Sequence, residues 1–323
     1  YRHTCVTMVS GDAVCWGRNH VGQLGVGSTV NALSPPSSGV ALPASGGNAR
    51  VVQLALSGEH TCALMESGSV ICWGGNDAGQ LGLGHTQNIG DDEIPSAYIT
   101  MPLSGGSDRV VSISSGPSSA HTCGVMEGGD VVCWGFNDGG RLGLGHLANA
   151  LTPEVIALPP ASGVTAAKAV SVSQAHACAV YVNDAVTCWG YGSWGRLGLG
   201  AGDTVGDDET PAQYGAFVDV SALLGYAPRI TSMTAADTAA CVSTTARDVV
   251  CWGTGPLHAQ GNTQTVGDSA PLPYVGPAML VPPPPSASPT ASGTPSVSGT
   301  PSVSASATPS VSGTPSATPS VSG

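Results

Sequence analysis

The chain has 323 residues, only 9% of them charged, and nine basic against twenty-one acidic side chains give a formal net charge of −12. Soluble domains average about 25% charged residues, so other polar groups, or groups added later, must cover this surface. The acidic balance repels nucleic-acid phosphates and anionic membranes. Because the chain also lacks an apolar run of about eighteen residues, we expect neither nucleic-acid binding nor membrane insertion.

The ten cysteines form five pairs that share one spacing, Cys-x9-Cys. This spacing fits neither the Cys-x2-Cys knuckles of zinc ribbons nor a Cys-x-x-Cys redox motif. A regular, even set predicts five local disulfides, which persist in an oxidising compartment. The alternative is ten reduced, buried cysteines in a cytosolic protein. The predicted disulfides are Cys5–Cys15, Cys62–Cys72, Cys123–Cys133, Cys178–Cys188 and Cys241–Cys251.

The cysteine pairs mark five repeats of 55 to 63 residues that cover residues 1–281. Each repeat contains a first cysteine, an apolar stretch, a small turn, a second apolar stretch, the tripeptide Cys-Trp-Gly and a glycine-containing loop. In the second repeat these parts are His60-Thr61-Cys62, Cys72-Trp73-Gly74 and the loop Gly79-Gln80-Leu81-Gly82-Leu83-Gly84. A repeated unit of this size predicts a fold in which neighbouring units stack.

Each repeat predicts a β-hairpin. If Cys62 faces Cys72, residues 66–68 form a three-residue loop whose third residue needs a positive φ. Both faces of the hairpin are largely apolar, so each sheet needs a neighbour on both sides. The residues in the third place of the five loops are Gly11, Gly68, Gly129, Asp184 and Arg247.

The motifs His-Thr-Cys, Cys-Trp-Gly-x-Asn and Gly-Gln-Leu-Gly-x-Gly resemble the β-propeller repeats of the regulator of chromosome condensation family, in the cysteine-containing version found in secreted proteins. The resemblance implies an all-β fold, a propeller with one four-stranded blade per repeat. Family members commonly have seven blades, whereas five repeats are present here, so the ring either closes with five blades or lacks some. The stretch 270–281 could complete the first blade and latch the ring.

Several recurring residues invite a functional interpretation. The tryptophan of each Cys-Trp-Gly motif could belong to a light-sensing or ligand-stacking set, but one per repeat favours core packing. Trp194 lies outside the repeat pattern, near Tyr191, and is a candidate for an exposed contact. The histidines two residues before the first cysteine are interpreted as structural rather than as a metal-binding ring: they are His3, His60, His121 and His176.

A further position recurs four residues after the second cysteine. Asn and Gly replace each other where φ is positive, so we expect a positive φ there. The glycine loops that follow are expected to serve turn geometry, because no helical pattern follows them as a phosphate-binding loop would require. The residues at the recurring position are Asn19, Asn76, Asn137, Gly192 and Gly255.

Two acidic loops match each other in sequence. Clustered carboxylates are hard oxygen ligands, and extracellular Ca²⁺ could fill such a weak site. The alternative is a solvated acidic turn. The candidate Ca²⁺ ligands are Asp91, Asp92 and Glu93 in one loop and Asp207, Asp208 and Glu209 in the other. No cofactor is otherwise expected, and no catalytic signature stands out, so we do not expect an enzyme.

The composition changes at Pro282. Residues 282–323 contain no charged residue, aromatic or cysteine but 10 of the 25 prolines, with Ser or Thr at every even position from 286 to 322. Proline excludes a paired strand, so an extended polyproline-II-like stalk is expected. Ser/Thr-rich sequence with Pro is typical of O-glycosylated stalks and resembles hydroxyproline-rich glycoproteins, while a bare linker is the alternative. The candidate modified residues are Ser286, Ser288, Pro289, Thr290, Ser292, Thr294, Pro295, Ser296, Ser298, Thr300, Pro301, Ser302, Ser304, Ser306, Thr308, Pro309, Ser310, Ser312, Thr314, Pro315, Ser316, Thr318, Pro319, Ser320 and Ser322.

Together these features predict a secreted structural or adhesive glycoprotein of a cell wall, cell surface or extracellular fibre. Its expected partners are other copies of the chain, or extracellular glycans and glycoproteins, in an oligomer or a fibre. One alternative is a binding module, either a lectin or a protein inhibitor, that uses one propeller face. The other is guanine nucleotide exchange, which the family resemblance implies and which the disulfides and the acidic charge disfavour.

Overall fold

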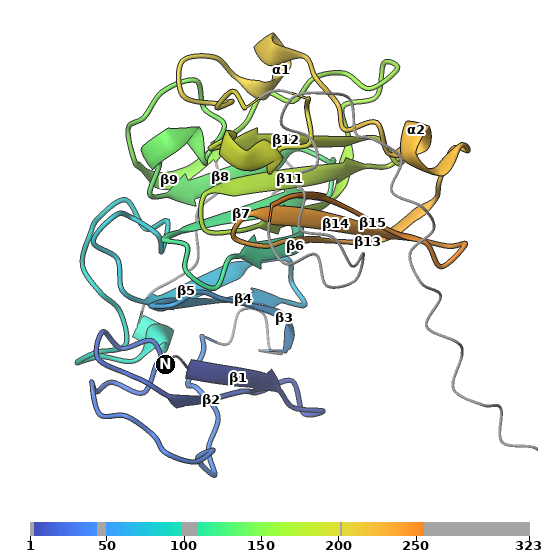
Figure 1. Ribbon diagram of the computed structural model, residues 1–323. Helices are drawn as coiled ribbons and strands as arrows, with labels where there is room; N and C mark the ends of the chain where they lie inside the picture. The colour runs from blue at the N-terminus through green and yellow to red at the C-terminus, as the bar shows by residue number, and fades with distance from the viewer. Residues whose placement is uncertain (1–2, 44–49, 98–108, 201, 255–323) are drawn as a thin grey trace, which may run out of the picture. The chain divides into compact units, whose positions relative to one another are not determined.

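The computed structural model describes residues 3–43, 50–97, 109–200 and 202–254, and these contain five antiparallel sheets (Figure 1). The strands of the first three sheets are β1 His3–Thr7 and β2 Ala13–Gly17; β3 Val51–Leu56, β4 His60–Met65 and β5 Val70–Gly74; and β6 Val110–Ser115, β7 His121–Met126, β8 Val131–Gly135 and β9 Ala150–Val155. Those of the last two are β10 Ala167–Val172, β11 His176–Tyr181 and β12 Val186–Gly190; and β13 Ile230–Ala235, β14 Ala239–Thr244 and β15 Val249–Gly253. We number the sheets as blades 1 to 5.

Each cysteine pair lies within a hairpin of the predicted register. In blade 2, Cys62 pairs with Cys72 and Leu64 with Val70. The backbone N–H of Met65 donates to Ser69 O, which closes the three-residue loop as predicted. Because hydrogen-bonded and non-bonded pairs alternate along an antiparallel ladder, the cysteines occupy a non-hydrogen-bonded pair, where the strands are closer. All five predicted disulfides are present, with Cα–Cα distances of 4.0 to 4.1 Å.

The predicted positive φ in the third loop residue is also confirmed, including in the two blades that lack glycine there. The φ angle is 86° at Gly68, 70° at Asp184 and 72° at Arg247. At Gly68 the space is filled as well, because a Cβ atom would lie 2.9 Å from the Arg109 side chain of the next blade. The turn therefore serves both the hairpin and the contact between blades.

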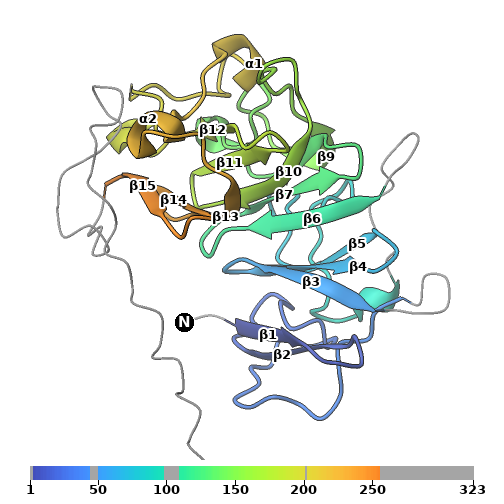
Figure 2. The same cartoon turned by 90° about the vertical axis from the view of Figure 1, so that its right-hand side faces the viewer.

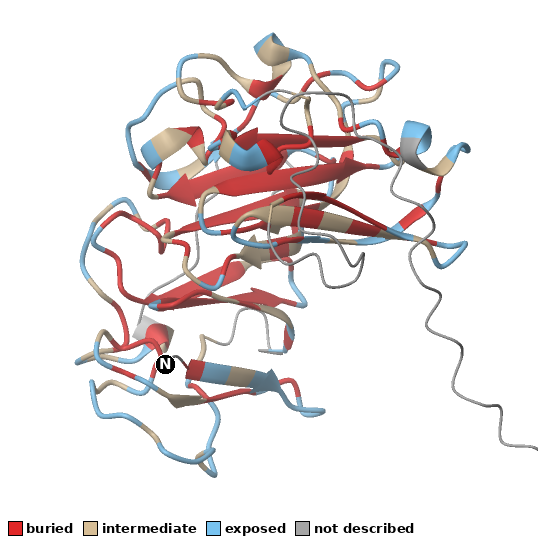
Figure 3. Cartoon of the chain, in the orientation of Figure 1, coloured by how far each residue is buried: buried red, intermediate tan, exposed pale blue. Residues whose placement is uncertain are grey.

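Blades 2 to 5 pack through their first strands, with contacts of β3 with β6, β6 with β10 and β10 with β13, and β1 of blade 1 contacts β3 (Figure 2). Side chains link these strands: Gln53 of β3 donates to Ile113 O of β6 at 2.8 Å and accepts from its N–H at 3.1 Å. Every residue of β4 and of β11 is buried, as Figure 3 shows for the middle blades. A hairpin buried on both faces is what the apolar pattern predicted.

The tryptophans of the Cys-Trp-Gly motifs lie in the core, as predicted. Trp73 and Trp134 are completely buried, and each indole N–H donates at 3.0 Å to a main-chain oxygen of the preceding blade, that of Gln23 and Gln80 respectively. In blades 2, 3 and 5 the buried ring thus ties its own third strand to a loop of the preceding blade. Within the described residues, the indole nitrogen of Trp189 in blade 4 has no hydrogen-bond partner. Trp16 of blade 1 is half-buried.

The blades differ in their outer strand. Blade 3 has four strands, and its fourth strand, β9, pairs with β8 from Gly135↔Ala150 onward. At the equivalent place in blades 1, 2 and 4 the structure has a single bridge, such as Gly74↔Ile89. Blade 4 is followed by an insertion with two short helices, α1 Pro211–Tyr214 and α2 Val220–Leu224. The 3-10 helices are η1 Pro95–Ala97, η2 Asp138–Gly140 and η3 Ser193–Gly195, and no helix of the described ranges is long and apolar enough to span a bilayer.

The positive φ predicted four residues after the second cysteine is wrong. Asn137 has φ −122° and Gly192 has φ −92°. The asparagine is used for its side chain: Asn19 Oδ1 accepts from Leu24 N at 2.8 Å, and its Nδ2 donates to Val30 O at 3.1 Å, which ties the glycine loop together. Glycine replaces it in blade 4 because a Cβ at residue 192 would lie 1.6 Å from Asp203 O. Gly255 lies outside the described residues.

Candidate functional site

Two recesses lie at opposite ends of the blades. We call the end that carries residues 57–59, 116–120, 173–175 and 236–238, which join the first two strands of blades 2 to 5, the loop face; it is at the left of Figure 1. The hairpin turns that follow each first cysteine form the opposite end. Loops on the loop face come from all five repeats, so this end brings together side chains far apart in sequence.

The loop-face recess has a volume of about 410 Å³ and is made by four blades. Its residues come from the loops between the first two strands and from the glycine loops. At its mouth Arg18 and Gln174 are exposed, and Glu59 Oε1 lies 3.1 Å from His20 Nε2. The lining residues are Arg18, Gly58, Glu59, Gln80, Ser118, Ser119, Ala120 and Gln174.

Beside this recess, aromatic rings stack on arginine side chains. In blade 4 the Arg196 guanidinium carbon lies 5.0 Å from the ring centres of both Tyr191 and Trp194. In blade 3 the equivalent pair is Arg141 over Phe136 at 4.7 Å. We call the set Tyr191, Trp194 and Arg196 the aromatic–arginine cluster. Arg141 and Phe136 adjoin the recess, because Arg141 donates to Gln174 O at 2.8 Å and the Phe136 N–H donates to Ala120 O at 2.9 Å. The cluster lies next to them, since the Tyr191 N–H donates at 2.9 Å to the oxygen of Ala175, which follows Gln174.

Trp194 and Tyr191 are exposed, as predicted for a contact outside the repeat core, with exposed fractions of 53% and 41%. Arg196 is buried beneath them and its guanidinium is held in place. Its Nε donates to Ser193 O at 3.0 Å and a terminal nitrogen donates to Asp237 O at 3.1 Å. Burial lowers the pKa of Arg196, whereas the neighbouring Tyr191 and Asp237 raise it.

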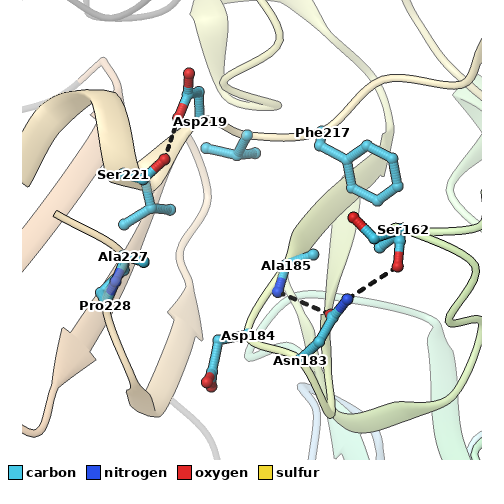
Figure 4. Close-up of a pocket in the computed structure, with 12 residues that line it drawn as sticks. Ser162, Asn183, Asp184, Ala185, Phe217, Asp219, Ser221, Ala227 and Pro228 are labelled. Atoms are coloured by element: carbon cyan, nitrogen blue, oxygen red, sulfur yellow. Dashed lines mark hydrogen bonds between the residues drawn. The ribbon is translucent and has the colours of Figure 1, made fainter.

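The second recess, of about 500 Å³, lies at the hairpin-turn end between blade 4 and the insertion (Figure 4). Phe217 forms one wall and contacts the Tyr181 ring edge-on at 5.8 Å. Polar groups that line this recess already make hydrogen bonds within the fold. Asn183 Nδ2 donates to Ala161 O at 2.9 Å, and Asp219 caps α2 by accepting from Ala222 N at 2.9 Å. This recess therefore has less to offer a ligand than the loop face.

Asp184, on the rim of the second recess, joins blades 4 and 5. Its side chain is buried and accepts from Ile230 N at 3.1 Å. It also pairs with Arg229 at 3.1 Å and with Lys168, the only lysine of the chain. Where the hairpin turn has glycine in place of Asp184, the next blade donates to a main-chain oxygen instead. The Val110 N–H, for example, donates to Gly68 O at 2.9 Å. The Asp184 carboxylate therefore links blades 4 and 5, a role that the sequence analysis did not predict.

The four repeat histidines are buried. His60 contacts Ser57 Oγ at 2.6 Å and Thr122 Oγ1 of the next blade at 2.8 Å. Burial, and secondarily the neighbouring His3, lowers the pKa of His60 to about 3. Burial, and then Arg196, likewise lowers the pKa of His176 to about 3. Buried rings whose pKa is lowered support the structural interpretation of these residues.

The predicted acidic groups lie together in each loop. The carboxylate oxygens of Asp91, Asp92 and Glu93 lie within 4.8 Å of one another, and so do those of Asp207, Asp208 and Glu209. Burial and the neighbouring aspartates raise the pKa of Glu209 to about 7 and that of Glu93 in the same direction. Each loop also packs closely on the preceding blade, since a Cβ at Gly140 would lie 2.5 Å from Asp207 N. Ca²⁺ binding at either loop stays a prediction.

Several predictions concern residues outside the described ranges. These are the stalk 282–323 with all its candidate modification sites, its boundary with residues 1–281, and the latch 270–281. What sequence reasoning missed is the stacking of Arg196 and Arg141. A signal was present, because aligned repeats place these arginines where the first two repeats have Gln23 and Gln80.

Comparison with known proteins gives matches along most of the described chain. The model of the regulator of chromosome condensation (RCC1) repeat matches residues 10–64, 67–124 and 128–180, and a second RCC1 repeat model matches residues 51–80 and 110–141. The ultraviolet-B receptor UVR8 of Arabidopsis thaliana is 30% identical over 200 residues, which are 61% of this chain and 41% of the receptor. The human E3 ubiquitin-protein ligase HERC2 is 30% identical over 203 residues, 63% of this chain but 4% of the ligase.

Solved structures agree in fold. Yeast RCC1 (Prp20), crystallised bound to Kap60, superposes with a TM-score of 0.63 at 18% identity and covers 87% of this chain and 60% of that one. Human WBSCR16 superposes with a TM-score of 0.62 at 21% identity, over 79% of this chain and 60% of that one. The chain thus spans less than two thirds of the length of each of these four proteins. The repeat models, together with the blades and their motifs, show that this chain belongs to the regulator of chromosome condensation (RCC1) repeat family.

Proposed function

We propose that this chain is a secreted binding module with a structural or adhesive role at a cell surface, in a cell wall or in an extracellular fibre. The observation that carries the proposal is a disulfide in every one of the five blades. Disulfides persist in oxidising compartments and are rare in the cytosol. A set repeated blade by blade is hard to reconcile with a reducing environment.

Binding, rather than chemistry, is the activity we propose for the propeller. Among its relatives are a receptor, UVR8, and the human X-linked retinitis pigmentosa GTPase regulator. Yeast Prp20 was crystallised with Kap60 and studied for its binding to Gsp1p and histones. The ligase relatives match over only a small part of their length, as HERC2 does over 4%. We propose other copies of the chain, or extracellular glycans and glycoproteins, as the partners.

We also propose, from its composition, that the stalk is O-glycosylated and hydroxylated at proline. Ser or Thr at every even position from 286 to 322, interrupted by proline, is the composition of an O-glycosylated, proline-hydroxylated segment. Such a segment would hold the propeller away from its attachment point. Intact-mass and peptide mass spectrometry of the native protein tests this part, and a tail with only unmodified Pro, Ser and Thr contradicts it.

The compartment is tested by thiol mapping. Cells expressing the full chain are lysed in the presence of an alkylating reagent, and the medium and lysate are analysed separately. We expect the protein in the medium or wall fraction with all ten cysteines protected until a reductant is added. Recovery from the cytosol with alkylated cysteines is the result that contradicts secretion. Electron microscopy of the native material then distinguishes fibres from single particles.

A soluble binding module without a structural role is the second candidate. The observation that favours it is the exposed aromatic–arginine cluster beside the loop-face recess. Single particles by electron microscopy, together with ligand binding on this face, would support it over the structural role.

A further inference from the structure

We propose that the loop face is a binding site for an uncharged glycan chain, with Trp194 and Tyr191 as the stacking platform and the loop-face recess as the site for sugar hydroxyls. The inference rests on the proposed function, because a glycan partner presupposes an extracellular binding module. It goes further by naming the site and the chemical class of the ligand.

Trp194 has a positive φ, which the equivalent residues Val21 and Ala78 of blades 1 and 2 do not share. Its φ is 66°, and the equivalent residue of blade 3, Gly139, has φ 65°. A bulky residue with positive φ is an outlier, and left-handed backbone costs about 1–2 kcal/mol for an L-residue. Packing does not explain the choice, because the indole is 53% exposed. An unfavourable conformation that presents an exposed aromatic ring points to a contact made outside the chain.

The ring is presented rigidly. Arg196 lies between Tyr191 and Trp194, and its hydrogen bonds to Ser193 O and Asp237 O fix the guanidinium. Each aromatic side chain therefore has one face on the guanidinium and an exposed remainder. Side chains held in place before binding lose little entropy when a ligand arrives. A fixed pair of rings suits a ligand with a flat apolar face, as the C–H face of a pyranose ring has.

The adjoining recess supplies the polar half of such a site. Hydroxyl and amide side chains dominate its lining, with one cation, Arg18, and one carboxylate, Glu59. Its formal charge is balanced, and about 410 Å³ is within the range of small-ligand sites. An uncharged polyhydroxyl ligand can exchange hydrogen bonds with the exposed Arg18, Glu59 and Gln174. Gln80 and Ser119 are buried and already hydrogen-bonded within the fold. An anionic chain would meet a molecule of net charge −12.

The same chemistry could come from two sources, a free neutral polysaccharide or a neutral O-glycan on the stalk of another copy. The experiment therefore uses full-length protein and three probes: labelled neutral gluco-, galacto-, manno- and arabino-oligosaccharides; glycopeptides released from the protein's own stalk; and a synthetic, unglycosylated peptide of residues 286–322. Binding is followed by acrylamide quenching of tryptophan fluorescence, because four of the six tryptophans are completely buried and Trp194 is exposed, and by calorimetry.

The decisive variant is Trp194→Gly. Glycine relieves the left-handed backbone, so the melting temperature should stay the same or rise. Glycan affinity should fall about tenfold or more, because a stacking face is lost. Tyr191→Ala should weaken binding in the same direction. Tyr226→Ala is the matched control: Tyr226 has the same 41% exposure as Tyr191 but follows α2, away from the loop face.

Binding of a neutral oligosaccharide or stalk glycopeptide that protects Trp194 from quenching, and that Trp194→Gly abolishes, supports the inference; the two probes separate the sources. Binding of the unglycosylated peptide alone, or of none of the probes, overturns it and leaves a protein as the partner of this face. Equal affinity of Trp194→Gly and the parent chain overturns the site. None of these negative results affects the disulfide mapping, so failure of the glycan site and failure of the secreted module are distinguishable.

Discussion

Each of the first four blades has a histidine two residues before its first cysteine, and in blades 1 and 2 this side chain contacts a threonine of the next blade. His3 Nε2 lies 2.6 Å from Thr61 Oγ1, and His60 Nε2 lies 2.8 Å from Thr122 Oγ1. Because the Thr61 hydroxyl donates to Gln23 O at 3.0 Å, the histidine N–H is the donor in the first contact. The His-Thr dipeptide thus links blades in sequence, and not only strands within one blade.

The histidine–threonine link is absent where the next blade has alanine in place of the threonine. The residues equivalent to Thr61 are Ala177 in blade 4 and Ala240 in blade 5, both buried. Within the described residues, the side-chain nitrogens without a hydrogen-bond partner include Nε2 of His121 and of His176. A buried polar atom without a partner destabilises the fold by about 1–3 kcal/mol. The replacement of threonine by alanine in blades 4 and 5 therefore explains why Nε2 of His121 and of His176 lacks a partner.

We expect Ala177→Thr and Ala240→Thr each to stabilise the protein by about 1 kcal/mol, which corresponds to roughly 3 °C in melting temperature, by supplying the missing hydroxyl. The reverse change, Thr122→Ala, should destabilise it by a similar amount. Thermal unfolding monitored by circular dichroism measures both. A lower melting temperature for both threonine variants would mean that the added side chain does not fit, and would contradict the proposed equivalence of the blades.

At the scale of the element, the interface between blades 4 and 5 depends on one carboxylate. Asp184 stands where the first three blades have glycine, and it keeps the positive φ of the turn. Its carboxylate accepts from the Ile230 N–H and pairs with Arg229 and Lys168. Asp184→Asn retains an acceptor and should destabilise the protein by about 1 kcal/mol. Asp184→Ala also leaves the Ile230 N–H without its partner, so its destabilisation should reach about 2–3 kcal/mol.

Chemical denaturation at low and high salt measures this difference. The effect of Asp184→Asn should shrink as salt screens the ion pairs, whereas the additional effect of Asp184→Ala should remain. Glu127→Gln is the control, since Glu127 and Arg109 lie 3.7 Å apart and are both about half-exposed, and an exposed ion pair contributes little. Equal effects for Asp184→Ala and the control would show that Asp184 is dispensable at this interface.

The acidic loops make stability depend on pH. The pKa of Glu209 is raised from 4.5 to about 7, by burial first and then by Asp208 and Asp207. A carboxyl whose pKa is higher in the folded state binds more protons there, so stability falls as pH rises from about 4.5 to 7. Glu209→Gln removes this titration and should raise the melting temperature at pH 8 while changing it little at pH 4.

The Glu209→Gln variant also tests the predicted Ca²⁺ site. Millimolar Ca²⁺ should raise the melting temperature of the parent chain at pH 8, above the raised pKa of Glu209, and should raise that of Glu209→Gln less. Glu93→Gln is the matching variant in the other loop. If Ca²⁺ leaves the melting temperature of the parent chain unchanged at pH 8, the metal site should be dropped and the loops interpreted as solvated turns.

The elements that the sequence predicted are those governed by local rules. A fixed Cys-x9-Cys spacing determines the hairpin register, and loop length determines which residue needs a positive φ, even where it is Asp184 or Arg247. The error at Asn19, Asn76 and Asn137 arose because asparagine has two uses, a left-handed backbone and a side chain that closes a loop. Only the contacts across the loop distinguish them.

At the scale of the whole molecule, the features that sequence could not place are those made between blades. Arg196 and Tyr191 are near in sequence, yet the exposed platform they form with Trp194 depends on Asp237 in the next blade holding the guanidinium. The recess beside it draws on four blades. The number of repeats in the sequence predicts that the blades share a loop face. Which side chains meet on that face depends on how each blade packs on the next.

Stacked repeats also predict how the described blades should open. The disulfides of blades 2, 3 and 4 are buried, whereas Cys5 in blade 1 and Cys241 in blade 5 are half-buried. In blade 1 the strand β1 is mostly exposed, while β4 of blade 2 is buried throughout. Since thiol–disulfide exchange requires access to sulfur, a mild reductant should cleave Cys5–Cys15 and Cys241–Cys251 before the other three.

Timed reduction, alkylation and peptide mapping give the order of cleavage, and hydrogen exchange gives the matching order of opening, with slowest exchange in β4, β7 and β11. A repeat array in which each blade contacts only its neighbours opens from its least buried units. Simultaneous loss of all five disulfides, with uniform exchange across the sheets, would instead show that the blades unfold as one cooperative unit. In that case the contacts between blades, such as the histidine–threonine links, would contribute more to stability than burial within each blade.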